Sequence, residues 1–340
     1  MKPHYFFSSV TRNSDLPEVP FDVDSLDRRL WETGDFVLGR VKGKRNRLYK
    51  CETRAGRMAD LVRGDLLIGA LGDRTATLEG VGYWSDIGDD LEMEALTPAG
   101  LIGKATSTSL LLPEFMKLDY RGHIMRYGEK LGMPDFVVQV KPMTIDIPVI
   151  LLIGTSMSAG KTTAGQVVIR ALNYFGKKVV AAKLTGAARY RDILTFRDAG
   201  ATHIFDFVDA GMPSTVCPEE DYRKALESLI SRIANVGADV LVVEAGASPL
   251  EPYNGDVLMD YLKQFVRFTV LCASDPYAVL GVQTAFSDHL VANLVSGPAA
   301  NTDAAVALVK KLTGLPALNL LDRSNYPELM EILKEALDIS

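Results

Sequence analysis

The segment from Pro148 to Phe175 constrains the fold more than any other part of the chain. It opens with an apolar run at 149–153, made of the β-branched and leucine residues that form a strand buried on both faces. A loop with glycine at both ends, 154–160, follows, and Lys161 and Thr162 come directly after it. Apolar residues then recur at helical spacing. A strand, a glycine-bounded loop ending in Gly-Lys-Thr and a helix are the context that a phosphate-binding loop requires.

This loop has the chemistry of a site for a polyphosphate. Small residues allow successive backbone N–H groups to curl around phosphate oxygens, and the following helix presents its positive end to the same anion. Lys161 would neutralise the β- and γ-phosphates, and the Thr162 hydroxyl would bind Mg²⁺. The strict pattern G-x-x-x-x-G-K-[ST] places glycine at position 155, where this chain has Thr155, and its first glycine is Gly154. We predict that the phosphates contact Gly154, Thr155, Ser156, Ser158, Ala159, Gly160, Lys161, Thr162 and Thr163.

Composition limits the classes of protein to which the chain can belong. Its 340 residues are enough for two domains, and 47% hydrophobic residues are enough to bury large cores. A formal net charge of −6 disfavours nonspecific binding to nucleic acid or to a membrane surface. The three cysteines lie far apart without a C-x-x-C pair, so neither a disulfide framework nor a thiolate zinc site is indicated. With no signal-peptide pattern and no apolar stretch of transmembrane length, we expect a cytoplasmic protein.

Residues 1–145 are predicted to form a β-rich domain of unknown role. Short strand-like segments separated by turn residues are typical of a small antiparallel barrel or sandwich, and they lie at 35–42, 47–53, 65–71 and 75–83. The pattern weakens between 91 and 121, where 98–103 is typical of a loop. We interpret His123 as a surface or core histidine rather than a catalytic one. Substrate recognition, oligomerisation and covering of the nucleotide are all open as roles for this domain.

Residues 146–340 are predicted to form the P-loop nucleotide-binding domain of an α/β fold. Strands that alternate with helices predict a largely parallel sheet with helices on both faces. After the strand at 149–153, further strands are predicted at 178–183, 239–244, 268–272 and 316–320. Helices are predicted at 219–233, 256–265, 276–292, 302–312 and 327–337. In such sheets the ligand lies beyond the carboxyl ends of the strands, so residues that follow a strand are candidates for the site.

Two charged residues at such positions are predicted to take part in catalysis with Lys161. Lys183 would be a second cation near the phosphates, and the alternative is a surface lysine that ends a strand. Glu244 follows four apolar residues, which is typical of a carboxylate that holds Mg²⁺ directly or through water. The alternative for Glu244 is a structural glutamate in a salt bridge. After the next strand, Asp275 is interpreted as the cap of a helix.

The charged stretch at 190–212 adds a further candidate for the metal. It is either a switch-like region that contributes Asp206 or Asp209, or a substrate-binding stretch. We therefore predict a magnesium site made of Thr162, Glu244 and Asp206. Because the guanine-binding pattern Asn-Lys-x-Asp does not occur, we expect the nucleotide to be ATP.

The loop resembles that of dethiobiotin synthetase and its relatives in the SIMIBI class of P-loop proteins. The stretch at 183–186 is similar to the family's Lys-Pro-x-x-x-Gly segment, where the lysine helps to bind phosphate and substrate. The stretch at 243–247 is similar to its Val-Glu-Gly-Ala-Gly segment with the metal-linked glutamate. Leu280 and Gly281, followed by Thr284, resemble a later helix of the family. The resemblance covers about residues 148–320.

The chain also resembles the carboxy-terminal half of a second family, which joins such a P-loop domain to a Rossmann domain and includes D-glutamate N-acetyltransferases. The stretches at 206–208 and 244–246 carry this resemblance, whereas the Rossmann half is absent. The chain departs from dethiobiotin synthetase at Ser156 and Ser158, where that family has acidic residues, and at Leu184, where it has proline. The lack of lysine at position 156 argues against the MinD-type partition ATPases.

The residues and the resemblance together imply an ATP-binding, magnesium-dependent enzyme. It would transfer the γ-phosphoryl group to a small carboxylate or amine substrate, or use it for activation, as a ligase, kinase-like enzyme or ATP hydrolase. One alternative is a regulatory or assembly NTPase. Another is an acyltransferase whose loop binds the phosphates of coenzyme A. We expect a small-molecule substrate and a homodimer, with neither nucleic acid nor membrane as a partner.

Overall fold

A computed structural model describes residues 4–286 and 292–339. The chain divides into two compact units, and each unit combines segments that are far apart in the sequence. The β-rich unit consists of Met1–Val140, Gly186–Arg191 and Phe207–Ser228. The parallel-sheet unit consists of Lys141–Thr185, Asp192–Asp206 and Leu229–Ser340. None of the helices within the described ranges is long and apolar enough to cross a membrane.

The β-rich unit is built on a closed barrel. Strands β6, β3, β11, β9 and β10 pair in that order, and β10 pairs back with β6, which closes the ring. Every pair in the ring is antiparallel except β6–β10, so the predicted barrel is confirmed with one parallel junction. The strands of this unit are β1 (Tyr5–Phe7), β2 (Asp22–Asp24), β3 (Phe36–Val41), β4 (Lys50–Glu52), β5 (Met58–Asp60), β6 (Leu66–Leu71), β7 (Arg74–Ala76), β8 (Gly80–Tyr83), β9 (Glu92–Ala95), β10 (Leu101–Thr108), β11 (Met116–Arg126) and β12 (Glu129–Lys130).

The interval from 91 to 121 carries three of the five barrel strands, although its sequence pattern is weak. The loop predicted at 98–103 is wrong for its second half, because β10 begins at Leu101. Gly103 lies inside that strand, where a Cβ atom would come within 2.8 Å of Leu96 and 3.0 Å of the Tyr83 backbone. The close approach of these segments therefore requires glycine at position 103 of the strand. In the sequence, glycine is more typical of a loop, which is why the strand was not predicted there.

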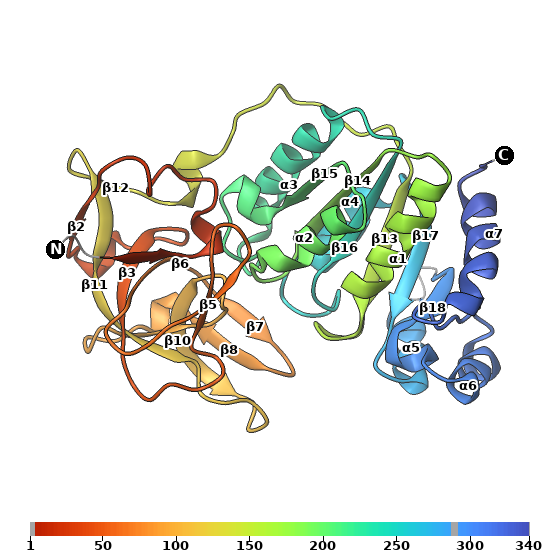
Figure 1. The fold of residues 1–340 in the computed structure, drawn as a ribbon, viewed down its shortest axis with the longest axis horizontal. Helices are drawn as coiled ribbons and strands as arrows, with labels where there is room; N and C mark the ends of the chain where they lie inside the picture. The colour runs from red at the N-terminus through yellow and green to blue at the C-terminus, as the bar shows by residue number, and fades with distance from the viewer. Residues whose placement is uncertain (1–3, 287–291, 340) are drawn as a thin grey trace. The chain divides into compact units, whose positions relative to one another are not determined.

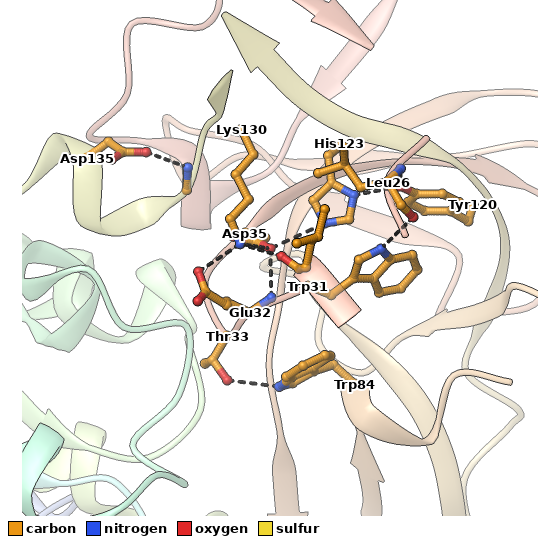
Figure 2. Close-up of polar contacts among 12 residues, drawn as sticks. Leu26, Trp31, Glu32, Thr33, Asp35, Trp84, Tyr120, His123, Lys130 and Asp135 are labelled. Carbon is orange, nitrogen blue, oxygen red and sulfur yellow. Dashed lines mark hydrogen bonds and ion pairs between the residues drawn. The ribbon is translucent and has the colours of Figure 1, made fainter. Parts of the chain in front are cut away.

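Figure 2 shows a buried polar cluster in the β-rich unit that contains His123. The Tyr120 hydroxyl lies 2.6 Å from Nδ1 of His123, and Asp35 Oδ2 lies 3.3 Å from Nε2 of the same ring. Lys130 Nζ donates to Asp35 at 3.0 Å, and the Trp31 ring packs on His123 at 5.0 Å between centroids. His123 is completely buried, so it is a core histidine within a hydrogen-bonded network.

The second unit contains a six-stranded parallel sheet in the order β15-β14-β16-β13-β17-β18. Helices flank this sheet (Figure 1), which confirms the predicted α/β fold. The strands are β13 (Val149–Gly154), β14 (Val179–Thr185), β15 (His203–Asp206), β16 (Val240–Ala245), β17 (Val266–Cys272) and β18 (Leu294–Ser296). The helices of the carboxy-terminal half are α1 (Lys161–Tyr174), α2 (Tyr190–Asp198), α3 (Glu219–Ala234), α4 (Gly255–Leu262), α5 (Pro276–Ala285), α6 (Asp303–Thr313) and α7 (Tyr326–Ala336).

Two edge strands of this sheet differ from the prediction. The strand predicted at 316–320 is wrong, because only Ala317 pairs there, through an isolated parallel bridge to Val295. The edge position belongs instead to the three-residue strand β18. Strand β15 lies inside the charged stretch 190–212 and was not predicted. The helix predicted at 276–292 ends at Ala285, and residues 287–291 lie outside the described residues.

Candidate phosphate-binding site

The glycine-bounded loop joins β13 to α1 and is fastened to the end of β17. The Thr155 N–H donates to the Cys272 carbonyl at 3.1 Å, and the Thr155 hydroxyl accepts from the Ser274 N–H at 3.1 Å. Gly160 has φ of +97° at the start of α1, a left-handed conformation that favours glycine. The first backbone N–H groups of a helix have no partner within the helix. The N–H groups at the start of α1, where the loop ends, can therefore bind an anion.

Lys161 folds back over the loop to which it belongs. Its ammonium group donates to the Ser156 carbonyl at 2.7 Å, and the side chain is buried. Gly154 makes room for it, because a Cβ atom there would lie 3.0 Å from the ammonium nitrogen. Burial lowers the pKa of Lys161 below its ordinary value, against the opposing effect of the Glu244 carboxylate. An anionic ligand would therefore strengthen the charged form of this lysine.

Glu244 lies at the end of β16 and contacts the first turn of α1. Its Oε2 accepts from the Thr162 hydroxyl at 2.9 Å, and the residue is only 2% exposed. Burial raises the pKa of Glu244, whereas the neighbouring Lys183 and Lys161 act to lower it. A hydroxyl and a carboxylate side by side are oxygen donors of the kind that Mg²⁺ prefers. Thr162 and Glu244 therefore fit a magnesium ion.

Lys183 lies on β14 between two acidic residues on neighbouring strands. Strand register places it beside Glu244 of β16 and beside Asp206 of β15. Its ammonium group binds Asp192 Oδ2 at 2.5 Å. Burial by itself lowers the pKa of Lys183, but Asp192 and Glu244 raise it above its ordinary value. Lys183 is therefore a buried, charged lysine and not a surface residue.

The small residues that follow Glu244 have a role in packing. A Cβ atom on Gly246 would lie 2.2 Å from the Thr185 carbonyl oxygen and 2.6 Å from Cε of Lys183. The Gly246 N–H also donates to the backbone carbonyl of Thr185 at 3.1 Å. The space behind Glu244 is thus filled by the strand that carries Lys183.

The structure brings together most of the residues predicted from the sequence. Lys161 and Thr162 lie at the start of α1, and Glu244 and Lys183 lie near the carboxyl ends of the adjacent strands β16 and β14. Asp206 is separated from Glu244 by the strand of Lys183, so Thr162 and Glu244 form the part of the predicted magnesium set that is in direct contact. Among the described residues, no group of three or more His, Cys, Asp and Glu side chains is arranged to hold a metal.

The remaining predicted residues lie around this group. In the loop, Ser158 is exposed and Ser156 is buried, while Thr163 is exposed on the first turn of α1. Asp209 belongs to the β-rich unit and pairs with Arg12 at 3.0 Å. Asp275 caps α5, as predicted, because its carboxylate accepts from the two backbone N–H groups at positions 277 and 278.

Asp192, the ion-pair partner of Lys183, was not predicted from the sequence. It lies in the first turn of α2, nine residues after the lysine in the sequence. Asp192 still matches a sequence signal, because acidic residues are enriched in the first turn of a helix and this one follows the strand that carries Lys183. Helix α2 lies inside the charged stretch 190–212, for which no helix was predicted.

No family model matches the chain, and no curated protein matches it. Among solved structures it is similar to the signal recognition particle receptor FtsY from Elizabethkingia anophelis, with 16% identity and a TM-score of 0.35, over 58% of this chain and 66% of that chain. It is similar to the hydrogenase maturation factor HypB from Helicobacter pylori, in complex with nickel, with 16% identity and a TM-score of 0.38, over 56% of this chain and 87% of that chain.

A third similar structure is a DUF1611 family protein from Anabaena variabilis, with 15% identity and a TM-score of 0.38, over 59% of this chain and 62% of that chain. This chain spans just under two thirds of the FtsY and DUF1611 chains. The resemblance to dethiobiotin synthetase stays a prediction from the sequence. The site is therefore defined by its own geometry: a strand, a glycine-bounded loop and a helix, with two buried lysines around a buried glutamate.

Proposed function

We propose that this protein binds a nucleoside triphosphate through the loop at 154–162 and catalyses transfer of its γ-phosphoryl group. One observation carries the proposal. Two buried ammonium groups, on Lys161 and Lys183, flank the buried Glu244 carboxylate, which accepts from the Thr162 hydroxyl at the start of α1. A helix amino terminus binds phosphate through its backbone N–H groups, and nearby ammonium groups add charge-assisted hydrogen bonds.

The four side chains have distinct roles in this proposal. Lys161 and Lys183 would neutralise the negative charge that spreads over the phosphoryl oxygens during transfer. Thr162 and Glu244 would hold Mg²⁺, which supplies further charge neutralisation when it is bound. The γ-phosphoryl group would leave the β-phosphate oxygen for a small carboxylate or amine, or for water, and release the nucleoside diphosphate. We propose ATP as the nucleotide because the guanine-binding pattern is absent from the sequence.

The Lys161→Ala variant tests nucleotide binding. We expect isothermal titration calorimetry to detect ATP binding to the unchanged protein and none to the variant, because one ammonium group completes the loop's contact with phosphate. Lys178→Ala, which removes an exposed lysine side chain between α1 and β14, is the matched control and should bind ATP normally. Equal binding by the unchanged protein and Lys161→Ala would contradict the proposal.

A second measurement separates the possible chemistries. ADP release that depends on an added small acid or amine supports phosphoryl transfer. Slow hydrolysis that only a macromolecule stimulates would support a regulatory or assembly NTPase, and heat from acetyl coenzyme A but not from ATP would support an acyltransferase. One observation favours the regulatory alternative. The segments Gly186–Arg191 and Phe207–Ser228, which follow the strands of Lys183 and Asp206, belong to the β-rich unit.

A further inference from the structure

The ammonium groups that would receive phosphate are held by acceptors of the protein itself. Lys183 Nζ binds Asp192 at 2.5 Å, and Lys161 Nζ donates to the carbonyl of Ser156. A buried ammonium group needs such a partner, since leaving it uncompensated in the interior is costly. Asp192 thus supplies to Lys183 the negative charge that a ligand phosphate would otherwise bring.

Of the three acidic residues around Lys183, Asp192 is the one that can withdraw. Glu244 and Asp206 lie at the ends of central and edge strands and are 2% and 1% exposed. The Asp192 side chain is 21% exposed and projects from the first turn of a helix, so it can turn towards water. A polyphosphate next to Lys183 would repel this carboxylate, because like charges at short range in a protein interior interact strongly.

The start of the helix that carries Asp192 is held by a buried acid of the β-rich unit. Glu52 accepts from the backbone N–H groups of Tyr190 and Arg191 at 2.8 and 2.9 Å, and it also accepts from the Ser9 hydroxyl. These residues all belong to one compact unit, and Glu52 is 1% exposed. Because Asp192 is the next residue in α2, Glu52 fixes the helix at the point where it presents Asp192 to Lys183.

We propose that Asp192 competes with ligand phosphate for the Lys183 ammonium group, and that Glu52 is a positioning residue that keeps Asp192 in place. This inference rests on the proposed function, since it concerns how the same site is regulated. Binding of a nucleotide polyphosphate displaces Asp192 from Lys183, and this displacement costs free energy. The cost depends on how firmly the hydrogen bonds to Glu52 fix the start of α2. Glu52 thereby adjusts nucleotide affinity through the position of α2.

Calorimetry of charge-neutralising variants tests the competition. Asp192→Asn removes the competing charge and should bind ATP, and pyrophosphate as a probe without a base, about tenfold more tightly than the unchanged protein. Asp198→Asn is the matched control, since it removes an exposed aspartate from the last position of the same helix, and it should leave the affinity unchanged. Asp192→Glu keeps the negative charge, so its ATP affinity should stay close to that of the unchanged protein.

Glu52→Gln tests the positioning step. The amide weakens the acceptor for the two backbone N–H groups, so ATP affinity should rise several-fold, and hydrogen exchange should become faster at Tyr190 and Arg191. Glu18→Gln, which changes an exposed glutamate of the same unit, is the control. Thermal denaturation of each variant checks that it is folded, and Asp192→Ser replaces Asp192→Asn if that variant does not fold.

The outcomes separate the inference from the proposed function. Absence of ATP and pyrophosphate binding in the unchanged protein and in every variant would overturn the proposed function. Binding by the unchanged protein with equal or weaker affinity in folded Asp192→Asn would overturn the competition. A gain in Asp192→Asn with none in Glu52→Gln would overturn the role of Glu52 alone.

Discussion

At the scale of single residues, opposing electrostatic effects act on the Glu244 carboxyl group, since burial raises its pKa and two lysines lower it. Its carboxylate is buried between two lysines and accepts from the Thr162 hydroxyl, and its pKa is raised by burial. Glu244→Gln keeps the size of the side chain and an acceptor for Thr162 but removes the charge that would hold Mg²⁺. We expect near-normal nucleotide binding without Mg²⁺ and a turnover lower by about a hundredfold or more. Calorimetry and an ADP-release assay measure the two quantities, and unchanged turnover would remove Glu244 from the mechanism.

The cysteine thiols are a second residue-scale feature, and they give a pH dependence. Cys51, Cys217 and Cys272 form no disulfide in the described part of the chain, and burial raises the pKa of Cys217 to about 12. At pH 8 the reactive thiolate of such a group is on the order of one part in ten thousand. Because deprotonation increases with pH, the rate with a disulfide reagent should rise about tenfold per pH unit between pH 8 and 10.

The thiol measurement compares the native protein with the protein in urea. All three cysteines should react fast once unfolding restores an ordinary thiol pKa. A native rate at Cys217 that is already fast at pH 8 and level above pH 9 would contradict the assignment. The substitution Cys217→Ser identifies which part of the signal comes from this residue.

At the scale of elements, the central strands were predictable and the edge strands were not. Strands β13 and β16 are buried at every position, so their continuous apolar runs stand out. Strand β15 begins with the exposed His203 and ends with Asp206, and β18 has three residues, so neither offers a long apolar run. The site residues at the ends of central strands were found for the same reason. Asp192 was missed because the sequence of α2 is dominated by charge.

Gly246, just after β16, packs against Thr185 and Lys183 of β14, and Gly246→Ala tests that packing. The added methyl group would lie 2.2 Å from the Thr185 carbonyl, so the strands must separate or Lys183 must move. We expect a loss of about 1–3 kcal/mol in the free energy of unfolding, measured by urea denaturation. Gly281→Ala in α5 is the control with the opposite sign. Apart from the chain neighbours and the backbone of α5 itself, no described atom lies within 4 Å of a Cβ there, so a gain of about 0.5–1 kcal/mol is expected. Equal stability of the two variants would contradict this account.

At the scale of the whole molecule, the predicted domain boundary at 145/146 differs from the division into compact units, and the two imply different folding units. The sequence predicts that 146–340 is a domain, whereas the segments Gly186–Arg191 and Phe207–Ser228 belong to the β-rich unit. Their partners there include the Glu52 carboxylate and Arg12, which pairs with Asp209 at side-chain exposures of 7% and 10%. Breaking a buried ion pair by removing one partner costs about 3–5 kcal/mol.

Expression of the fragment 146–340 tests whether it folds independently of residues 1–145. Without Glu52 and Arg12, the segments 186–191 and 207–217 should lose their protection from hydrogen exchange, and the fragment should unfold at lower urea than the full chain. The full-length Arg12→Ala variant is the internal comparison, because it removes one partner while keeping the barrel, and it should show the loss mainly at 207–217. If the fragment retained full-chain protection in both segments, 146–340 would be an independent folding unit. The hold of Glu52 on α2 would then contribute nothing to the order of that helix.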